Sequence, residues 1–149
     1  MASNVLLRVF PKKIEVRQGQ EIRVWVMIEN QTSRIIYVPI RRMRLFWNSI
    51  DVGEQPMKVR IVEIQTGNIV PGIGLCIRPG AITDAELTAL APEELGGRVL
   101  NLSKYFIFPQ RSGVYRAELW LDTRRIWKGY SKQLWRGITN KEYVEIILI

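Results

Sequence analysis

The sequence is poor in side chains that perform chemistry at neutral pH. It contains no histidine and a single cysteine, Cys76. Without histidine there can be no Ser-His-Asp or Cys-His nucleophile and no imidazole metal ligand. One thiol also leaves the usual zinc ligand sets incomplete, and its apolar neighbours are typical of a buried cysteine rather than a reactive one. We therefore expect no catalytic site, no metal site and no cofactor.

Acidic pairs are the remaining candidates for catalysis. Asp84 lies close to Glu86, and Glu93 is followed directly by Glu94. The pattern of residues 83–96 predicts a short helical insertion, with a capping box, a second helix start at a proline and a Gly-Gly stop. Negative charge in the first turn of a helix offsets the helix dipole. This placement explains the acids without catalysis, so we expect the protein not to be an enzyme.

Clusters that mix cations with aromatic rings are the more informative feature. One cluster follows Pro39, and the other spans residues 124–136. Tryptophan, tyrosine and arginine are enriched as anchors of protein interfaces. The candidate partner-binding residues are Trp127, Tyr130, Trp135, Arg124 and Arg125. Cations beside stacking rings also suit single-stranded nucleic acid, and the candidates for that alternative are Arg41, Arg42, Arg44, Lys128 and Lys132.

The net charge is +8 and the isoelectric point is about 10.0. It is unevenly distributed, because residues 81–97 carry four acids and no base. Residues 1–46 carry nine bases and three acids, and residues 98–149 carry ten bases and four acids. Such a polarised surface permits contact between copies of the chain. A third interpretation of the basic aromatic clusters is a solvated face, in which the stems of arginine and lysine cover buried tryptophans.

Alternation of polar and apolar residues predicts strands along most of the chain. Residues 21–29 place Ile22, Val24, Val26 and Ile28 on one face. Trp25 and Met27 lie on the other face beside Arg23, and we expect that face to be partly covered. Further strands are predicted at residues 5–10, 14–16, 34–38, 57–65, 99–102, 113–121 and 143–149, with another candidate at 41–47.

These elements predict the fold class. The 149 residues fit one domain, with a hydrophobic fraction of 47%. Seven or more short strands separated by turn residues favour an antiparallel sandwich. The prediction is a mostly-β, immunoglobulin-like sandwich spanning residues 1–149, with a short helical insertion near 83–96. The apolar end of the chain, residues 143–149, is predicted to be a strand buried in the sheet or paired with a partner across an edge.

A partial family resemblance agrees with this fold. Its carriers are Ile77-Arg78-Pro79-Gly80, Leu100 to Tyr105, Ser112 to Leu119 and, earlier, Gly19 to Asn30. Their order resembles bacterial immunoglobulin-like domains such as the non-catalytic β-domain of deuterolysin-type proteases and the intracellular proteinase inhibitors. The resemblance implies a sandwich, and a protease-inhibitor-like binding role is one alternative that it raises. The chain departs from the pattern at 81–97 and after Asp122.

The expected function is that of a non-enzymatic interaction or structural subunit, self-associating or part of a larger assembly such as a virion. A protein partner or a second copy is expected, nucleic acid is the alternative, and no small-molecule substrate is evident. No stretch approaches the roughly 18 apolar residues of a membrane-spanning helix. The apolar run at residues 5–7 is shorter than the apolar region of a signal peptide. We therefore expect a cytoplasmic protein, or a component of a particle that is assembled inside the cell.

Overall fold

The computed structural model describes residues 4–43, 56–73, 84–124 and 133–149. Strands dominate these residues, as predicted, and the helical elements among them are short 3-10 turns. The strands are β1 (Val5–Phe10), β2 (Lys13–Val16), β3 (Arg23–Asn30), β4 (Ile36–Val38), β5 (Met57–Glu63), β6 (Thr88–Leu90), β7 (Leu95–Asn101), β8 (Gly113–Leu121) and β9 (Glu142–Leu148). The 3-10 turns are η1 (Ile40–Arg42), η3 (Asp84–Glu86) and η4 (Leu102–Lys104).

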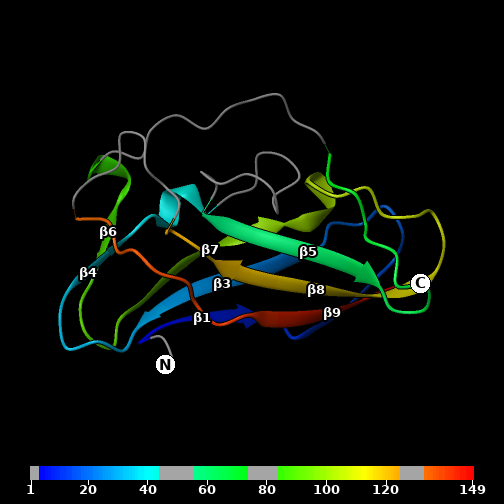
Figure 1. Cartoon of the computed structure of the whole chain (residues 1–149). Coiled ribbons are helices and arrows are strands. Elements are labelled where there is room, and N and C mark those ends of the chain that lie inside the picture. Colours follow the sequence, from blue (N-terminus) through cyan, green and yellow to red (C-terminus); the bar gives the residue numbers. More distant parts are fainter. Residues whose placement is uncertain (1–3, 44–55, 74–83, 125–132) are drawn as a thin grey trace.

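Two larger sheets form the body of the molecule (Figure 1). The first sheet has the order β1-β3-β7, and all of its pairings are antiparallel. The second sheet has the order β2-β9-β8-β5, in which only the β2–β9 pairing is parallel. Strands β4 and β6 form a separate antiparallel pair. The chain passes from the first sheet to the second at the cis peptide bond between Phe10 and Pro11.

The strand order matches that of an immunoglobulin-like sandwich. In that fold the first, second and fifth main strands share one sheet, and the third, sixth and seventh share the other. Here β1, β3 and β7 correspond to the first set, and β5, β8 and β9 to the second. The strand β2 adds to the second sheet beside β9. The expected sandwich is therefore confirmed at the level of sheet order.

The core lies between the two sheets because each sheet turns alternate side chains inward. Val24, Val26 and Ile28 of β3 are fully buried, as their alternation predicts. They belong to one cluster with buried residues of the second sheet, including Ala117 and Val144. Among the described residues no helix is long and apolar enough to cross a bilayer.

The predicted helical insertion at residues 83–96 is wrong. Within the described residues 84–96 only η3 is helical, and it is a single 3-10 turn, while β6 pairs with β4 and β7 begins at Leu95. Glu93 has a φ of 70° and lies in a turn rather than a helix start. Strand pairing with β4 and β3 satisfies the backbone of this segment, and that tertiary gain overrides the local helix signals.

The Gly-Gly pair predicted to stop a helix instead lies inside β7. A Cβ atom on Gly97 would lie 1.9 Å from the carbonyl oxygen of Val26, and one on Gly96 would lie 2.7 Å from Cδ1 of Ile40. The two glycines therefore permit a close approach between β7 and its neighbours.

The last strand is confirmed, but it does not offer an edge to a partner. Strand β9 lies between β2 and β8 and pairs with both. Pairing of residues 145–148 with a partner across an edge is therefore wrong, because β8 occupies one edge there and β2 the other. The candidate strand at 41–47 is also wrong at its start, where η1 includes Arg41 and Arg42, and its remainder lies outside the described residues.

Candidate interaction surface

Most of the side chains predicted to contact a partner lie outside the described residues. They are Trp127, Tyr130, Arg125, Arg44, Lys128 and Lys132. Of the others, Trp135, Arg124 and Arg41 are described with their side chains. Arg41 is exposed at η1, and its carbonyl oxygen accepts a hydrogen bond of 3.0 Å from Nη1 of Arg98 in β7.

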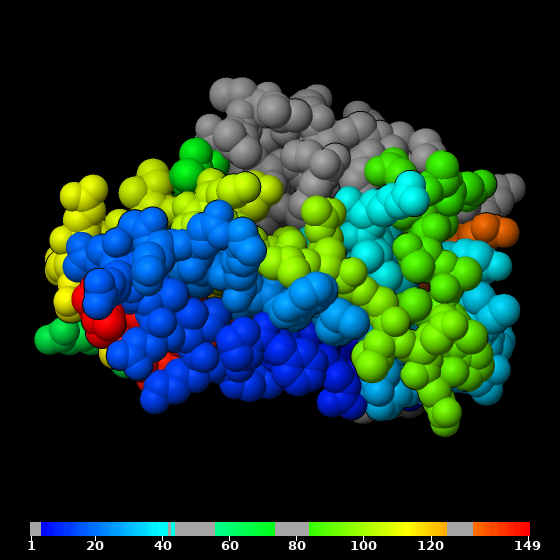
Figure 2. All heavy atoms as spheres, turned by 180° about the vertical axis from the view of Figure 1, so that it is seen from behind, coloured from blue at the N-terminus to red at the C-terminus, as the bar shows by residue number. Residues whose placement is uncertain are grey.

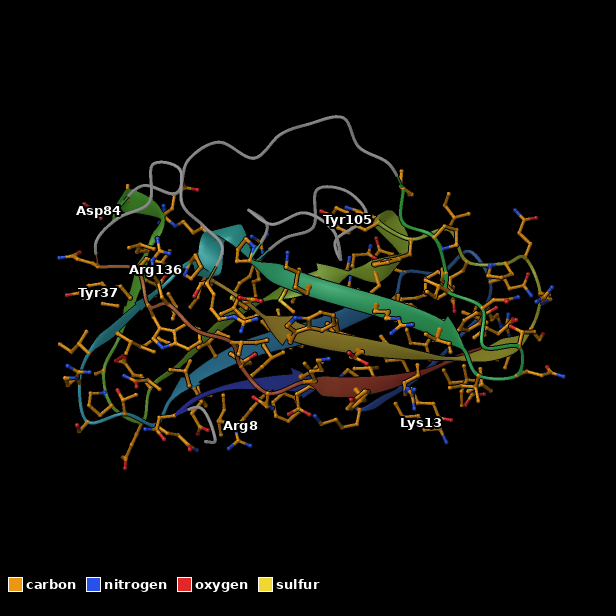
Figure 3. All side chains as sticks on the ribbon, viewed as in Figure 1. Arg8, Lys13, Tyr37, Asp84, Tyr105 and Arg136 are labelled. Atoms are coloured by element: carbon orange, nitrogen blue, oxygen red, sulfur yellow. The ribbon has the colours of Figure 1, made fainter. Side chains whose placement is uncertain are left out.

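Trp135 helps to close one end of the sandwich. It is partly buried against the main core. Its N–H donates to the carbonyl oxygen of Tyr37 at 2.8 Å, and its own carbonyl accepts from Oγ1 of Thr123 at 2.6 Å. Tyr37 and Arg136 lie at this same end of the molecule, which also carries Asp84 (Figure 3). These contacts give Trp135 a structural role, whatever else it binds.

Arg124 is held by a neighbouring carboxylate. Its Nε and Nη2 donate to Asp122 at 3.1 and 2.9 Å, and its backbone N–H donates to the same carboxylate at 3.0 Å. Partial burial raises the pKa of Asp122, but the hydrogen bonds and charge of Arg124 outweigh it, so the pKa lies below its ordinary value. A bidentate pair of this kind orders the arginine and neutralises it locally.

The two acidic pairs lie in separate turns. Asp84 and Glu86 belong to η3, whereas Glu93 and Glu94 belong to the turn before β7. Oε2 of Glu94 accepts a hydrogen bond of 3.0 Å from the N–H of Ala91, so this carboxylate stabilises its own turn. Within the described ranges no group of three or more acidic or cysteine side chains is placed to hold a metal ion.

A buried acid–arginine–tyrosine cluster lies at one end of the second sheet. Glu63 is only 4% exposed and accepts hydrogen bonds from Arg111 at 2.8 Å, Thr66 at 2.6 Å and Tyr115 at 3.1 Å. These hydrogen bonds, from Thr66 and Arg111 foremost, hold the pKa of Glu63 below its ordinary value, although burial opposes them. Burial and the neighbouring carboxylate raise the pKa of Tyr115. Every partner in the cluster is satisfied, which is typical of a structural site.

The outer face of the second sheet mixes charged, aromatic and apolar side chains. Nζ of Lys141 lies 3.1 Å from Glu118 and 4.9 Å from the ring centre of Trp120. Arg116 lies 5.5 Å from the ring centre of Tyr143. A shallow groove of about 370 Å³ crosses this face and is lined by Lys12, Ile64, Val114, Arg116, Tyr143 and Glu145. The rings here are already covered by cations of the same chain.

A hollow of about 280 Å³ opens at one end of the sandwich. Its lining includes the buried apolar residues Ile22, Phe106 and Leu148, and the polar residues Gln18 and Gln110. It gives access to the edge of the core. The described side chains around it include no charged group.

The outer face of the first sheet carries exposed aromatic and apolar side chains. Phe10 and Trp25 are opposite each other on β1 and β3, and they are 51% and 53% exposed. Val99 of β7 is opposite Trp25 on its other side, and Met27 lies two residues further along β3. Leu95, which is 50% exposed, lies at the far end of β7. From behind, the atoms of β1, β3 and β7 make up much of the visible surface (Figure 2).

Charged residues border this apolar face at both ends of β3. Arg23 pairs with Glu21 at one end, and its side chain is 67% exposed. At the other end Glu29 accepts hydrogen bonds of 3.0 and 2.8 Å from Nε and Nη2 of Arg8, and one of 2.9 Å from Gln31. Apolar centre and charged border together are the usual anatomy of a protein interface.

The alternation in the sequence identified the residues of this face on β3, and the expectation that the face is partly covered is confirmed. The alternation on β3 correctly assigns Arg23, Trp25 and Met27 to one face, which was expected to be partly covered. Met27 is partly buried, but more than half of Trp25 is exposed. Period-two alternation identifies the two faces of a strand, but it does not tell which of them solvent reaches.

Comparisons with known proteins leave the family open. No family model matches the sequence, and no curated protein matches it. Among solved structures, the chain is similar to one in the Salmonella enterica SafA pilin in complex with the SafB chaperone, with a TM-score of 0.40 and 9% sequence identity. The match covers 99% of this chain and 54% of that chain. The present chain thus spans about half the length of the protein it matches.

Proposed function

We propose that this chain is a non-enzymatic subunit that binds another protein through the outer face of the β1-β3-β7 sheet. The observation that carries the proposal is the exposed row of Phe10 and Trp25, continued by Val99. Contiguous apolar surface on a folded domain marks interaction sites. Aromatic residues, methionine and arginine are the types enriched at such sites.

The second sheet supports the same choice by contrast. Its outward rings, Trp120 and Tyr143, each lie under a cation of the same chain. Exchanging these contacts for a partner would break interactions that already exist. Trp25 has no such neighbour within the described part of the chain, so burying its ring removes apolar surface from water at little cost.

A photo-cross-linking experiment tests the proposal. A benzophenone amino acid is placed at position 25, and a matched variant carries it at Ile107, which is 56% exposed but lies outside the first sheet. We expect position 25 to yield a protein cross-link in the native source, and position 107 to yield much less. Equal yields at both positions would contradict the proposal, as would a nuclease-sensitive product, which would favour the nucleic-acid alternative.

A further inference from the structure

We infer that the protein bound by this face is a second copy of the same chain, packed face to face about a twofold axis. The inference rests on the proposed function and adds the identity of the partner. It follows from the order of side chains on β3. Arg23, Trp25, Met27 and Glu29 point outward in turn, whereas Val24, Val26 and Ile28 between them are buried.

When the strand is turned end over end, its outward side chains are complementary to those of the original strand. Consider an axis between the two copies that crosses the strands at the level of Val26. It reverses the strand direction, so residues equally distant from Val26 face each other. Arg23 then faces Glu29 of the second copy, and Trp25 faces Met27 of the second copy. The first contact is an ion pair formed twice, and the second is a favourable sulfur–aromatic contact.

The neighbouring strand fits the same arrangement. Phe10 is level with Trp25, and Arg8 is level with Met27. This axis keeps β1 over β1 of the second copy, so Phe10 faces the position of Arg8 across the interface. An arginine over an aromatic face is attractive. An axis parallel to β3 would instead bring Arg23 over Arg23 and Glu29 over Glu29, and the repulsion of like charges disfavours it.

The charged groups remain available for contacts between copies. All three hydrogen bonds to the Glu29 carboxylate end on Oε2, and in the described part of the chain Oε1 accepts none. The side chain of Glu29 is 18% exposed. Among the described residues Arg23 is tied to Glu21 alone, in an ion pair whose members are 67% and 51% exposed. Exposed pairs of this kind contribute little, so Arg23 can turn to a partner at small cost.

The size of the face sets the expected strength. Three strands about 4.8 Å apart and seven residues at about 3.4 Å each give a face of roughly 14 by 24 Å. The area of this face, roughly 340 Å², is below the roughly 800 Å² that each partner buries in a standard interface. We therefore expect a reversible dimer with a dissociation constant in the micromolar range.

Charge reversal provides a test with an internal rescue. Arg23→Glu and Glu29→Arg are measured singly, as an equimolar mixture, and combined in one chain, by sedimentation velocity from about 1 to 300 µM. Each single variant should raise the dissociation constant about tenfold or more, because like charges then meet twice. The mixture should form heterodimers, and the combined variant should form homodimers, because opposite charges meet again in both. Lys13→Glu, on the second sheet, lowers the net charge by the same amount as Arg23→Glu and should leave the dimer intact.

Glu29→Arg places a second arginine beside Arg8 and could disturb the fold. A second measurement therefore does not use that variant. The benzophenone at position 25 is used in a mixture of heavy- and light-isotope protein. We expect cross-links between copies that map to the peptide containing Met27. Wild-type protein that remains a monomer throughout, or rescue that fails in the mixture, would overturn the twofold arrangement. A cross-link from position 25 to a different protein would overturn the second copy as partner while leaving the proposed function standing, and no cross-link at all would remove both.

Discussion

At the scale of single residues, the chain uses its polar side chains for structure. The best example is Glu63, whose carboxylate joins the turn at Thr66, the loop at Arg111 and the strand β8 through Tyr115. Tyr115 is fully buried and its ring meets Phe108 edge-on, with ring centres 5.3 Å apart. A buried polar group is stable only where it is paired. This cluster therefore fixes how the end of the second sheet is built.

The pKa of Glu63 makes stability depend on pH. Because this pKa is lowered from 4.5, the folded state binds the proton less readily than the unfolded chain. The contribution is present above about pH 4.5 and is lost as the pH falls through the folded-state pKa. In urea titrations between pH 7 and pH 3, we expect Glu63→Gln to be less stable than wild type at neutral pH, with the difference shrinking in acid. A difference that stays constant would contradict this role, and Glu15→Gln, on the exposed β2, serves as the control.

The hydroxyl of Tyr115 should contribute on its own. Tyr115→Phe removes one hydrogen bond to Glu63 and keeps the contact of its ring with Phe108. We expect a loss of about 1 kcal/mol in the free energy of unfolding, because Thr66 and Arg111 still satisfy the carboxylate. Thermal or urea unfolding measures it. In a Glu63→Gln background the effect should be smaller, and equal effects in both backgrounds would show that the two groups are not coupled.

At the scale of elements, alternation predicted the strands well where one face is buried. The prediction for residues 113–121 coincides with β8, and that for 5–10 coincides with β1. It failed at 83–96, where helix-start residues occur in a segment that pairs with β4 and β3. Local signals of that kind record what a segment favours alone. They carry no information on which distant strand lies beside it.

The candidate site was predictable only in part for the same reason. The sequence predicts a site around Trp127 because the aromatic and basic residues there are adjacent in the chain. The face of the first sheet is assembled from three strands distant in the chain, so Phe10, Trp25 and Val99 come together only through strand order and register. A single sequence does not specify that register.

Gly97 is the glycine of the first sheet at which we expect a side chain to be least tolerated. A Cβ there would lie 1.9 Å from the carbonyl oxygen of Val26 and 2.7 Å from Sδ of Met27. Because the first of these atoms is backbone, β7 must separate from β3 to accept a methyl group. We expect Gly97→Ala to cost about 3 kcal/mol or more. Gly67→Ala is the comparison: no atom lies within 4 Å, but φ is 73°, and its cost should stay near 1 kcal/mol. Similar losses in unfolding experiments would contradict this account.

The side chain of Asn140 protects the free edge of β1. It accepts from the N–H of Leu7 at 2.8 Å and donates to the carbonyl of Leu7 at 3.1 Å, as a neighbouring strand would. We expect Asn140→Ala to lose about 1–2 kcal/mol and to speed amide exchange at Leu7. Asn140→Asp keeps the acceptor but not the donor, so it should retain part of the protection. Unchanged exchange at Leu7 in the alanine variant would show that the edge is protected by another group.

At the scale of the whole molecule, the two sheets have different outer surfaces. The second sheet places a cation over each of its outward rings, Trp120 and Tyr143, whereas the first sheet leaves Phe10 and Trp25 half exposed. A net charge of +8 keeps copies apart in general. Association through the first sheet must therefore rely on local complementarity, and the alternation of Arg23 and Glu29 around an apolar centre supplies it.

The most direct test of the account is the mass of the native protein with and without the indole ring of Trp25. Trp25→Asp is compared with wild type and with Ile107→Asp by size-exclusion chromatography with light scattering, in an extract of the native source and after purification. When the eluting concentration exceeds the micromolar dissociation constant, we expect wild type and Ile107→Asp to show a mass above the 17.3 kDa of one chain, and Trp25→Asp to run as a folded monomer. A folded Trp25→Asp variant that keeps the wild-type mass would contradict the claim that this face makes the contact.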